Sequence, residues 1–233
     1  MSEEKNGVIV DVLKHEDNSL KKVNYNVNKK ERASLYLFLK RSVDIIGSFF
    51  GLLILSPLFL VVSLLIFLED HHSPFFKQVR LTKNGKSFIM YKFRSMCVEA
   101  ESMLPNLQHA NEVDGPAFKI KNDPRITKVG RFLRKTSIDE LPQLINVLMG
   151  DMSIVGPRPP LPNEVEQYNE YQMQRLSVKS GLTCYWQCSG RNELSFDKWV
   201  ELDLKYINEM SILTDIKIIL MTVVSVFKRN GAY

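Results

Sequence analysis

The longest uncharged stretch of the chain constrains its fold more than any other feature. Residues 45–68 read IIGSFFGLLILSPLFLVVSLLIFL, which is 24 consecutive residues without a charge. A helix of about 20 apolar residues is long enough to cross the hydrocarbon core of a bilayer. The run begins too far from Met1 for an ordinary signal peptide, and no small-residue cleavage site follows it. A buried core helix is the alternative, but the length and the apolarity on every side favour contact with a membrane.

Both flanks of this run are basic. Nine Lys or Arg residues precede residue 42, and six more follow the run: Lys77, Arg80, Lys83, Lys86, Lys92 and Arg94. A helix that crosses once would leave one basic flank outside, against the positive-inside rule. Proline at mid-run removes a backbone donor and bends a helix, and a serine hydroxyl can satisfy the freed carbonyl. We therefore predict a re-entrant helix–break–helix over residues 35–70, broken at Ser56 and Pro57; a kinked single span is the alternative.

The remaining patterns predict an α+β fold that is mostly helical. Residues 1–34 are polar and predict a flexible arm, and residues 71–233 predict a cytoplasmic domain. Alternating residues around Asn84-Gly85 predict a small antiparallel hairpin with strands near 75–81 and 87–93. Helices are expected at about 97–108, 126–134, 138–149, 163–177, 195–210 and 213–229. The last has an apolar face (Ile216, Ile219, Leu220, Val223 and Phe227) beside Lys217, Lys228 and Arg229, which fits an interfacial amphipathic helix or a core-facing one.

Charge and composition narrow the class of partner. The net charge of +5 and the pI near 9.0 indicate an anionic partner: nucleic acid, a phospholipid surface or a phosphorylated substrate. Cys97, Cys184 and Cys188 make no disulfide framework and no complete metal set. The sequence contains no P-loop, no Rossmann glycine motif and no zinc signature. Phosphate binding would therefore depend on arginines and a metal–carboxylate site.

Two adjacent acids, Asp139 and Glu140, follow Ser137 in the segment RKTSIDELPQ. Ser137 and Glu140 fit a capping box at the start of a helix, which is the commoner explanation of this pattern. Basic residues nevertheless recur around the pair, among glycines and prolines or at a strand end: Lys92, Arg94, Arg125, Arg131, Arg134, Arg158 and Arg191. Arginine suits bidentate phosphate contacts, and paired carboxylates are hard ligands suited to Mg²⁺. The pair is thus also a candidate catalytic site.

The sequence resembles the bacterial sugar transferase family, the monotopic phosphoglycosyl transferases. Four segments carry the resemblance: KRSVDIIGSFFGLLILSPLFL, YKFRSM, SIDELPQLINVLMGDMSIVGPRP and SGRNELSFDKWVELDLKYI. It runs from about residue 36 to the C-terminus and departs at Cys184 and Cys188, where relatives usually carry glycine and an aliphatic residue. A membrane-anchored basic scaffold or nucleic-acid-binding protein is the rival interpretation, but the acid pair among the arginines would repel nucleic acid.

The resemblance implies a two-step covalent reaction at the cytoplasmic face of the bacterial inner membrane, which initiates exopolysaccharide or capsule synthesis. Asp139 would attack the β-phosphate of a UDP-sugar, expelling UMP, and undecaprenyl phosphate would then accept the phosphosugar, a hexose such as galactose or glucose. Asp139 and Glu140 would hold Mg²⁺, and a phosphate-binding set would comprise Lys92, Arg94, Arg134, Arg158 and Arg191. The implied partners are the UDP-sugar, undecaprenyl phosphate and membrane phospholipid, with no nucleic acid and a possible homo-oligomer.

Overall fold

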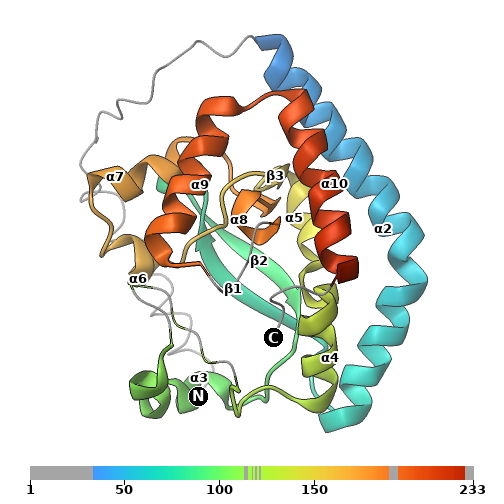
Figure 1. Ribbon diagram of the computed structural model, residues 1–233. Coiled ribbons are helices and arrows are strands. Elements are labelled where there is room, and N and C mark those ends of the chain that lie inside the picture. The colour runs from blue at the N-terminus through green and yellow to red at the C-terminus, as the bar shows by residue number, and fades with distance from the viewer. Residues whose placement is uncertain are drawn as a thin grey trace.

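The computed structural model describes residues 34–112, 115, 116, 118, 120, 122–188 and 194–228. One long helix, α2 (Ser34–Asp70), runs along one side of a domain of shorter helices and two small sheets (Figure 1). The mostly helical α+β class is therefore confirmed. The arm predicted for residues 1–34 lies outside the described residues, apart from Ser34. The other helices are α3 (Ala100–Leu107), α4 (Lys128–Thr136), α5 (Gln143–Met149), α6 (Pro162–Val165), α7 (Glu170–Met173), α8 (Tyr185–Cys188), α9 (Phe196–Glu209) and α10 (Ile212–Lys228).

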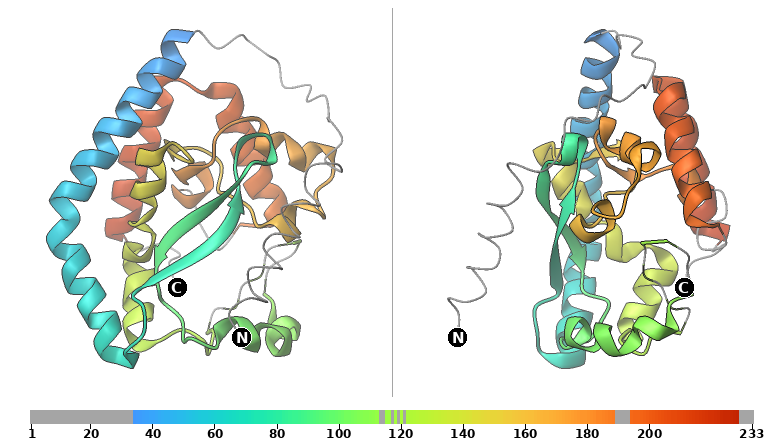
Figure 2. Two further views of the ribbon diagram at one scale, coloured as in Figure 1. Left: turned by 180° about the vertical axis from the view of Figure 1, so that it is seen from behind. Right: turned by 90° about the vertical axis from the view of Figure 1, so that its left-hand side faces the viewer.

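Helix α2 is a single helix that contains Pro57, so the predicted break at Ser56 and Pro57 does not divide it into two helices. The re-entrant path of this segment stays a prediction. Pro57 has no N–H for the carbonyl of Leu53, four residues earlier. The Ser56 hydroxyl donates to that carbonyl oxygen at 2.8 Å, and the helix continues. Figure 2 shows α2 curving along the domain from one end to the other. It is long and apolar enough to cross a membrane.

The predicted hairpin is confirmed. Strands β1 (Phe75–Leu81) and β2 (Ser87–Phe93) pair antiparallel, with Phe75 opposite Phe93 and Leu81 opposite Ser87. The connection contains Asn84 and Gly85, both with positive φ (59° and 74°). Glycine adopts this region without steric cost, and asparagine tolerates it better than most residues.

A second sheet pairs β3 (Ser153–Val155) with β4 (Gly181–Thr183) in parallel, whereas only an antiparallel sheet was predicted. Gly156 and Gly181 face one another here, and a Cβ on Gly181 would lie 2.0 Å from the Gly156 nitrogen. Only glycine permits this approach. The predicted helix over 163–177 is also wrong as one element, since α6, α7 and a 3₁₀ turn (Gln174–Ser177) replace it.

The N-terminal half of α2 is fixed to the domain by charged side chains that point inward. Arg41 donates to the carbonyl oxygens of Val147 and Leu148 at 2.6 and 2.8 Å, and so satisfies the C-terminal end of α5. Gly150 ends that helix with a φ of 95°, a left-handed conformation that glycine adopts without steric cost. Asp44 accepts hydrogen bonds from the Ser153 hydroxyl (3.0 Å) and the Ile154 N–H (2.8 Å), and Lys40 pairs with Asp215 of α10 at 2.7 Å.

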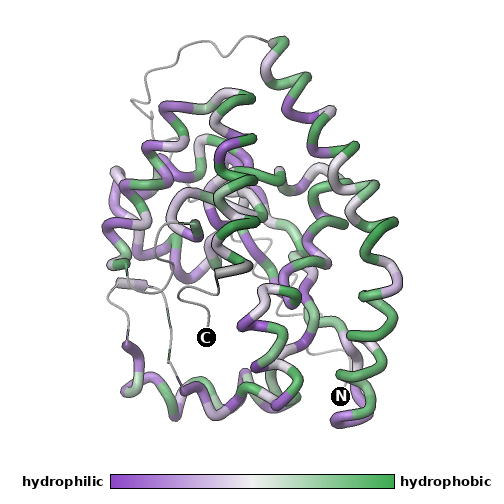
Figure 3. The backbone as a smooth tube through the Cα atoms, turned by 45° about the vertical axis from the view of Figure 1, so that its right-hand side comes forward, coloured by the Kyte–Doolittle hydropathy of each residue, from purple (hydrophilic) through white to green (hydrophobic). Residues whose placement is uncertain are grey.

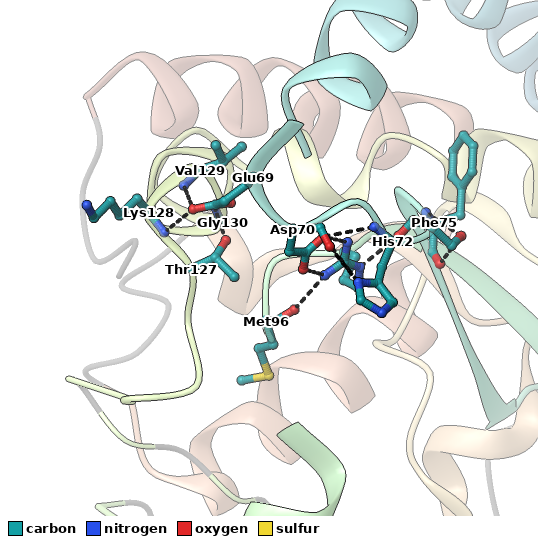
Figure 4. A network of polar contacts seen from close by, with 11 residues as sticks. Glu69, Asp70, His72, Phe75, Met96, Thr127, Lys128, Val129 and Gly130 are labelled. Carbon is teal, nitrogen blue, oxygen red and sulfur yellow. Dashed lines mark hydrogen bonds and ion pairs between the residues drawn. The ribbon is translucent and has the colours of Figure 1, made fainter. Parts of the chain in front are cut away.

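The C-terminal end of α2 is fixed to the same domain. The carboxylate of Glu69 accepts the N–H groups of Lys128 and Val129 at the start of α4, at 2.9 and 3.2 Å (Figure 4). Asp70 forms a two-pronged ion pair with Arg94, which follows β2. Both ends of the apolar helix therefore contact one domain.

The outward surface of α2 is apolar along its length. Large hydrophobic side chains are exposed there from Leu35 to Leu68, and α10 adds Leu213, Ile216, Leu220, Val223 and Val224. Figure 3 shows the hydrophobic colouring along α2. The opposite side of α10 is buried through Asp215 and Ile218, with Ile219 packed partly against the core, so α10 packs one side on the domain and exposes an apolar side. Its interfacial role stays a prediction.

Candidate active site

Asp139 and Glu140 lie in a 3₁₀ turn, Ile138–Glu140, between α4 and α5. The predicted helix over 138–149 is wrong at its start, since α5 begins at Gln143. Pro142 has no N–H for the Ile138 carbonyl, and the Leu141 N–H bonds to it instead at 3.1 Å. Ser137 is the left-handed C-cap of α4 (φ 58°), and its side chain makes no capping hydrogen bond to this turn. The capping box is therefore absent, and the turn presents the two acids on a tight bend.

This turn is anchored on the apolar helix. Ile138, the residue before Asp139, packs in a cluster with Val62 and Ile66 of α2 and with Leu133 of α4. Phe93 at the end of β2 joins the same cluster and meets Phe59 edge to face, with ring centroids 5.1 Å apart. The position of the acid pair is therefore set by packing against the segment expected to enter the membrane.

Two predicted cations stand near the acids. The Lys92 ammonium lies 3.0 Å from the Glu140 carboxylate, and both side chains are partly exposed. Arg134 of α4 donates through Nε to the Ser95 hydroxyl at 3.0 Å. Burial raises the pKa of Asp139; the Lys92 and Arg134 charges lower it and Glu140 raises it, and the pKa stays above its ordinary value. A carboxylate in such surroundings is a stronger nucleophile once ionised, and the nearby cations favour the ionised form.

A narrow pocket opens beside the acid pair. It is lined by Arg80, Met90, Lys92, Glu140, Gln143, Arg158, Pro159, Gly181, Leu182 and Gln187. Arg158 lies in the segment GPRPP, and its guanidinium is 3.6 Å from the buried Glu164 carboxylate. Lys92, Glu140 and Arg158, three of the predicted site residues, are thus brought together around one space.

One predicted phosphate ligand, Arg94, is not part of this group. Arg94 is paired with Asp70 at the end of α2 and also donates to the Ser73 carbonyl oxygen at 2.7 Å, so its contacts are those of a structural link. Arg191 lies outside the described residues. The pocket also contains Arg80, Gln143 and Gln187, which were not predicted as site residues. In the sequence Arg80 is one of several charges that flank the apolar run, and no motif contains the two amides.

The resemblance implies a Mg²⁺ ion at the acid pair. Magnesium at phosphate sites is held by one or two carboxylates and completes its shell with water and substrate oxygens. The described residues contain no group of three or more His, Cys, Asp or Glu side chains that could cage a metal. Adjacent Asp139 and Glu140 supply two carboxylates, the donor set that such a site needs, and they would hold a Mg²⁺ together with substrate phosphates and water.

Comparison with known proteins gives a consistent picture. The bacterial sugar transferase family matches residues 35–229. The galactosyl transferase CpsE of Streptococcus agalactiae is 51% identical over 200 residues, which are 84% of this chain and 44% of that protein. The undecaprenyl-phosphate galactose phosphotransferase of Salmonella typhimurium is 44% identical over 201 residues, 84% of this chain and 42% of its own length. The chain thus spans less than half of these two relatives. It covers 88% of the exopolysaccharide production protein ExoY of Rhizobium meliloti, at 39% identity over 83% of this chain.

Proposed function

The chain belongs to the bacterial sugar transferase family, and we propose that it transfers a sugar 1-phosphate from a UDP-sugar to undecaprenyl phosphate. The proposed sugar is a hexose, galactose before glucose, because two of the relatives described above are named for galactose transfer. The product would begin an exopolysaccharide or capsule unit. One observation carries the proposal: a buried aspartate beside a second acid and two cations, in a turn packed on an apolar helix.

In the first proposed step, a carboxylate oxygen of Asp139 attacks the β-phosphorus of the UDP-sugar. A new oxygen–phosphorus bond forms, the bond from that phosphorus to the bridging oxygen breaks, and UMP leaves with the bridging oxygen. Lys92, Arg134 and Arg158 offset the repulsion between carboxylate and diphosphate and stabilise the charge on the leaving group. A Mg²⁺ held by Asp139 and Glu140 would supply further neutralisation of the phosphate charge.

In the second proposed step, an oxygen of undecaprenyl phosphate attacks the same phosphorus. The phosphosugar moves to the lipid, and Asp139 is released as a free carboxylate. A covalent intermediate lets a water-soluble donor and a membrane-bound acceptor use one site in turn. The packing of Ile138 against α2 supports this order, because it puts the nucleophile next to the helix from which a lipid substrate would approach.

We further propose that the domain lies on the cytoplasmic face of the membrane, with α2 entering and leaving by that face. A straight helix of this length would extend about 55 Å, well beyond a hydrocarbon core of about 30 Å. The contacts of Arg41 and Asp44 at one end of α2, and of Glu69 and Asp70 at the other, support a helix whose two ends share one side. The apolar faces of α2 and α10 would contact phospholipid.

The test is UMP release from UDP-galactose, in the presence of Mg²⁺ and undecaprenyl phosphate, by the wild type and by Asp139→Asn. We expect the variant to release UMP at least 1,000-fold more slowly, because the amide removes the nucleophile. Asp197→Asn, an exposed aspartate in the first turn of α9, is the matched control and should keep wild-type rates. Normal turnover by Asp139→Asn would exclude the nucleophile, and a wild type inactive with every UDP-sugar would exclude the activity.

A further inference from the structure

Arg80 is a buried cation whose hydrogen-bond partners in the described part of the chain are uncharged. It lies near the end of β1 with 6% of its surface exposed. Its guanidinium donates to the Gln78 side-chain oxygen at 2.7 and 3.1 Å and to the Pro159 carbonyl oxygen at 3.1 Å. No ion pair joins it to an acid among the residues that the structure describes. Burying a charge without an anion is costly, so this arrangement needs a reason.

Two other buried arginines are each paired with a buried aspartate, which is the usual way to compensate a buried charge. Arg125 lies against Asp123 at 2.7 Å, and Arg175 lies against Asp203 at 2.8 Å, with all four side chains buried. Arg80 differs from both in having only uncharged partners. Burial and the neighbouring Arg158 charge lower the pKa of Arg80, whereas the charges of Glu164 and Glu140 raise it. The lowering effects are larger, and the pKa falls to about 9, so the surroundings as a whole disfavour the charged form.

The surroundings of Arg80 are those of an anion site. Arg80 lines the pocket together with Arg158, Lys92 and Glu140. A buried carboxylate whose charge acts on Arg80, Glu164, is already engaged: it accepts the Leu161 N–H at 3.0 Å and lies 3.6 Å from Arg158. Lys92 likewise pairs with Glu140. The remaining positive charge of the pocket is the guanidinium of Arg80.

We infer that Arg80, acting with Arg158, binds a phosphate group of a substrate, and that this bound anion compensates its buried charge. The inference rests on the proposed function for the identity of the substrate. The phosphate belongs either to the diphosphate of the UDP-sugar or to undecaprenyl phosphate. The hydrogen bond from Arg80 to the Pro159 carbonyl oxygen fixes the Arg80 guanidinium against the backbone next to Arg158, and both arginines line the same pocket. Planar guanidinium groups suit bidentate contact with phosphate oxygens.

The first experiment needs no turnover. Inorganic pyrophosphate is added without Mg²⁺ to the full chain in detergent, and the unfolding temperature is measured for the wild type, Arg80→Gln and Arg125→Gln. We expect pyrophosphate to raise the unfolding temperature of the wild type and of Arg125→Gln, and not that of Arg80→Gln. Without ligand, Arg125→Gln should unfold at a lower temperature because it leaves Asp123 unpaired, whereas Arg80→Gln should stay close to the wild type.

The second experiment identifies the source of the phosphate. For Arg80→Gln we expect the KM of one substrate to rise about 10- to 100-fold, the size of a lost charge-assisted contact. A change confined to UDP-galactose assigns Arg80 to the donor diphosphate, and a change confined to undecaprenyl phosphate assigns it to the lipid. Arg80→Lys, which keeps the charge but not the planar fork, should fall between the wild type and Arg80→Gln.

Two results would overturn the inference. One is an Arg80→Gln variant with unchanged KM values and an undiminished response to pyrophosphate. The other is a ligand-free unfolding temperature as low as that of Arg125→Gln, which would make Arg80 a structural residue. If pyrophosphate binding depends on Arg80 but the wild type releases no UMP, the phosphate site stands and the proposed function fails. If UMP release depends on Asp139 but no phosphate response depends on Arg80, the proposed function stands and the phosphate site at Arg80 fails.

Discussion

The Lys92 ammonium lies 3.0 Å from the Glu140 carboxylate, joining β2 to the turn that carries Asp139. Both side chains are partly exposed, so this ion pair contributes little to stability. The ion pair matters for the site because it holds a positive charge near Asp139. Lys92 lowers the pKa of Asp139 against the effect of burial, and lines the pocket that also contains Arg80 and Arg158.

Removing that charge should impair chemistry far more than folding. We expect Lys92→Met to slow UMP release about 100-fold, the scale of losing one preorganised electrostatic partner in an active site. Its unfolding temperature should remain within a few degrees of the wild type. Lys86→Met, at the exposed turn of the same hairpin, is the control and should match the wild type in both measurements. Rates within threefold of the wild type for Lys92→Met would remove Lys92 from the proposed mechanism.

Gly130 of α4 should be intolerant of a side chain. A Cβ at this position would lie 2.0 Å from the carbonyl oxygen of Ser95, so the backbone on one side has to move. Helix propensity alone would make Gly130→Ala stabilising by about 1 kcal/mol. We expect the opposite effect: overpacking should lower the free energy of unfolding by about 1–3 kcal/mol or more, as measured by thermal unfolding. Lys135→Ala, exposed on the same helix, should be nearly neutral; a stabilised Gly130→Ala would contradict the packing.

Local patterns predicted the elements whose formation depends on local chemistry. The hairpin strands follow from alternation around Asn84-Gly85, and α2 follows from an uncharged run too long for a strand. The continuity of α2 was missed because a proline predicts a break, whereas the Ser56 hydroxyl replaces the donor that Pro57 lacks.

Long-range contacts are what the sequence did not reveal. The parallel pairing of β3 with β4 joins residues almost 30 positions apart, and it depends on a close approach of Gly156 and Gly181 that no local pattern announces. The place of Arg80 in the pocket also depends on long-range contacts. Nothing in the sequence around it distinguishes a flank charge from a pocket residue, and only folding brings it to Pro159 and Arg158.

The Asp123–Arg125 pair gives the fold a predictable dependence on pH. Burial raises the pKa of Asp123, but hydrogen bonds from the Arg125 guanidinium and N–H outweigh this effect and hold the pKa below its ordinary value. Since the folded-state pKa is depressed, the pair stabilises the protein fully above the unfolded value of about 3.9. That stability is lost as the pH falls through the lower folded-state pKa.

We therefore expect Asp123→Asn to lower the free energy of unfolding by about 3–5 kcal/mol at pH 7, because it leaves the buried Arg125 without an anion. The difference from the wild type, measured by denaturant unfolding in detergent, should shrink as the pH falls below about 5. A difference that stays constant from pH 7 to pH 3 would show that the charge of Asp123 is not what stabilises this segment.

The two ends of α2 should lie on the same side of the membrane. Single cysteines introduced by Leu35→Cys and His72→Cys mark those ends, where both native side chains are exposed. In spheroplasts, a membrane-impermeant maleimide should label neither position above the background of the parent chain with Cys97, Cys184 and Cys188. After permeabilisation it should label both. Labelling of one end alone in sealed spheroplasts would mean that α2 crosses the bilayer, and the contacts of Arg41 and Asp70 with one domain would then have to be broken in the membrane.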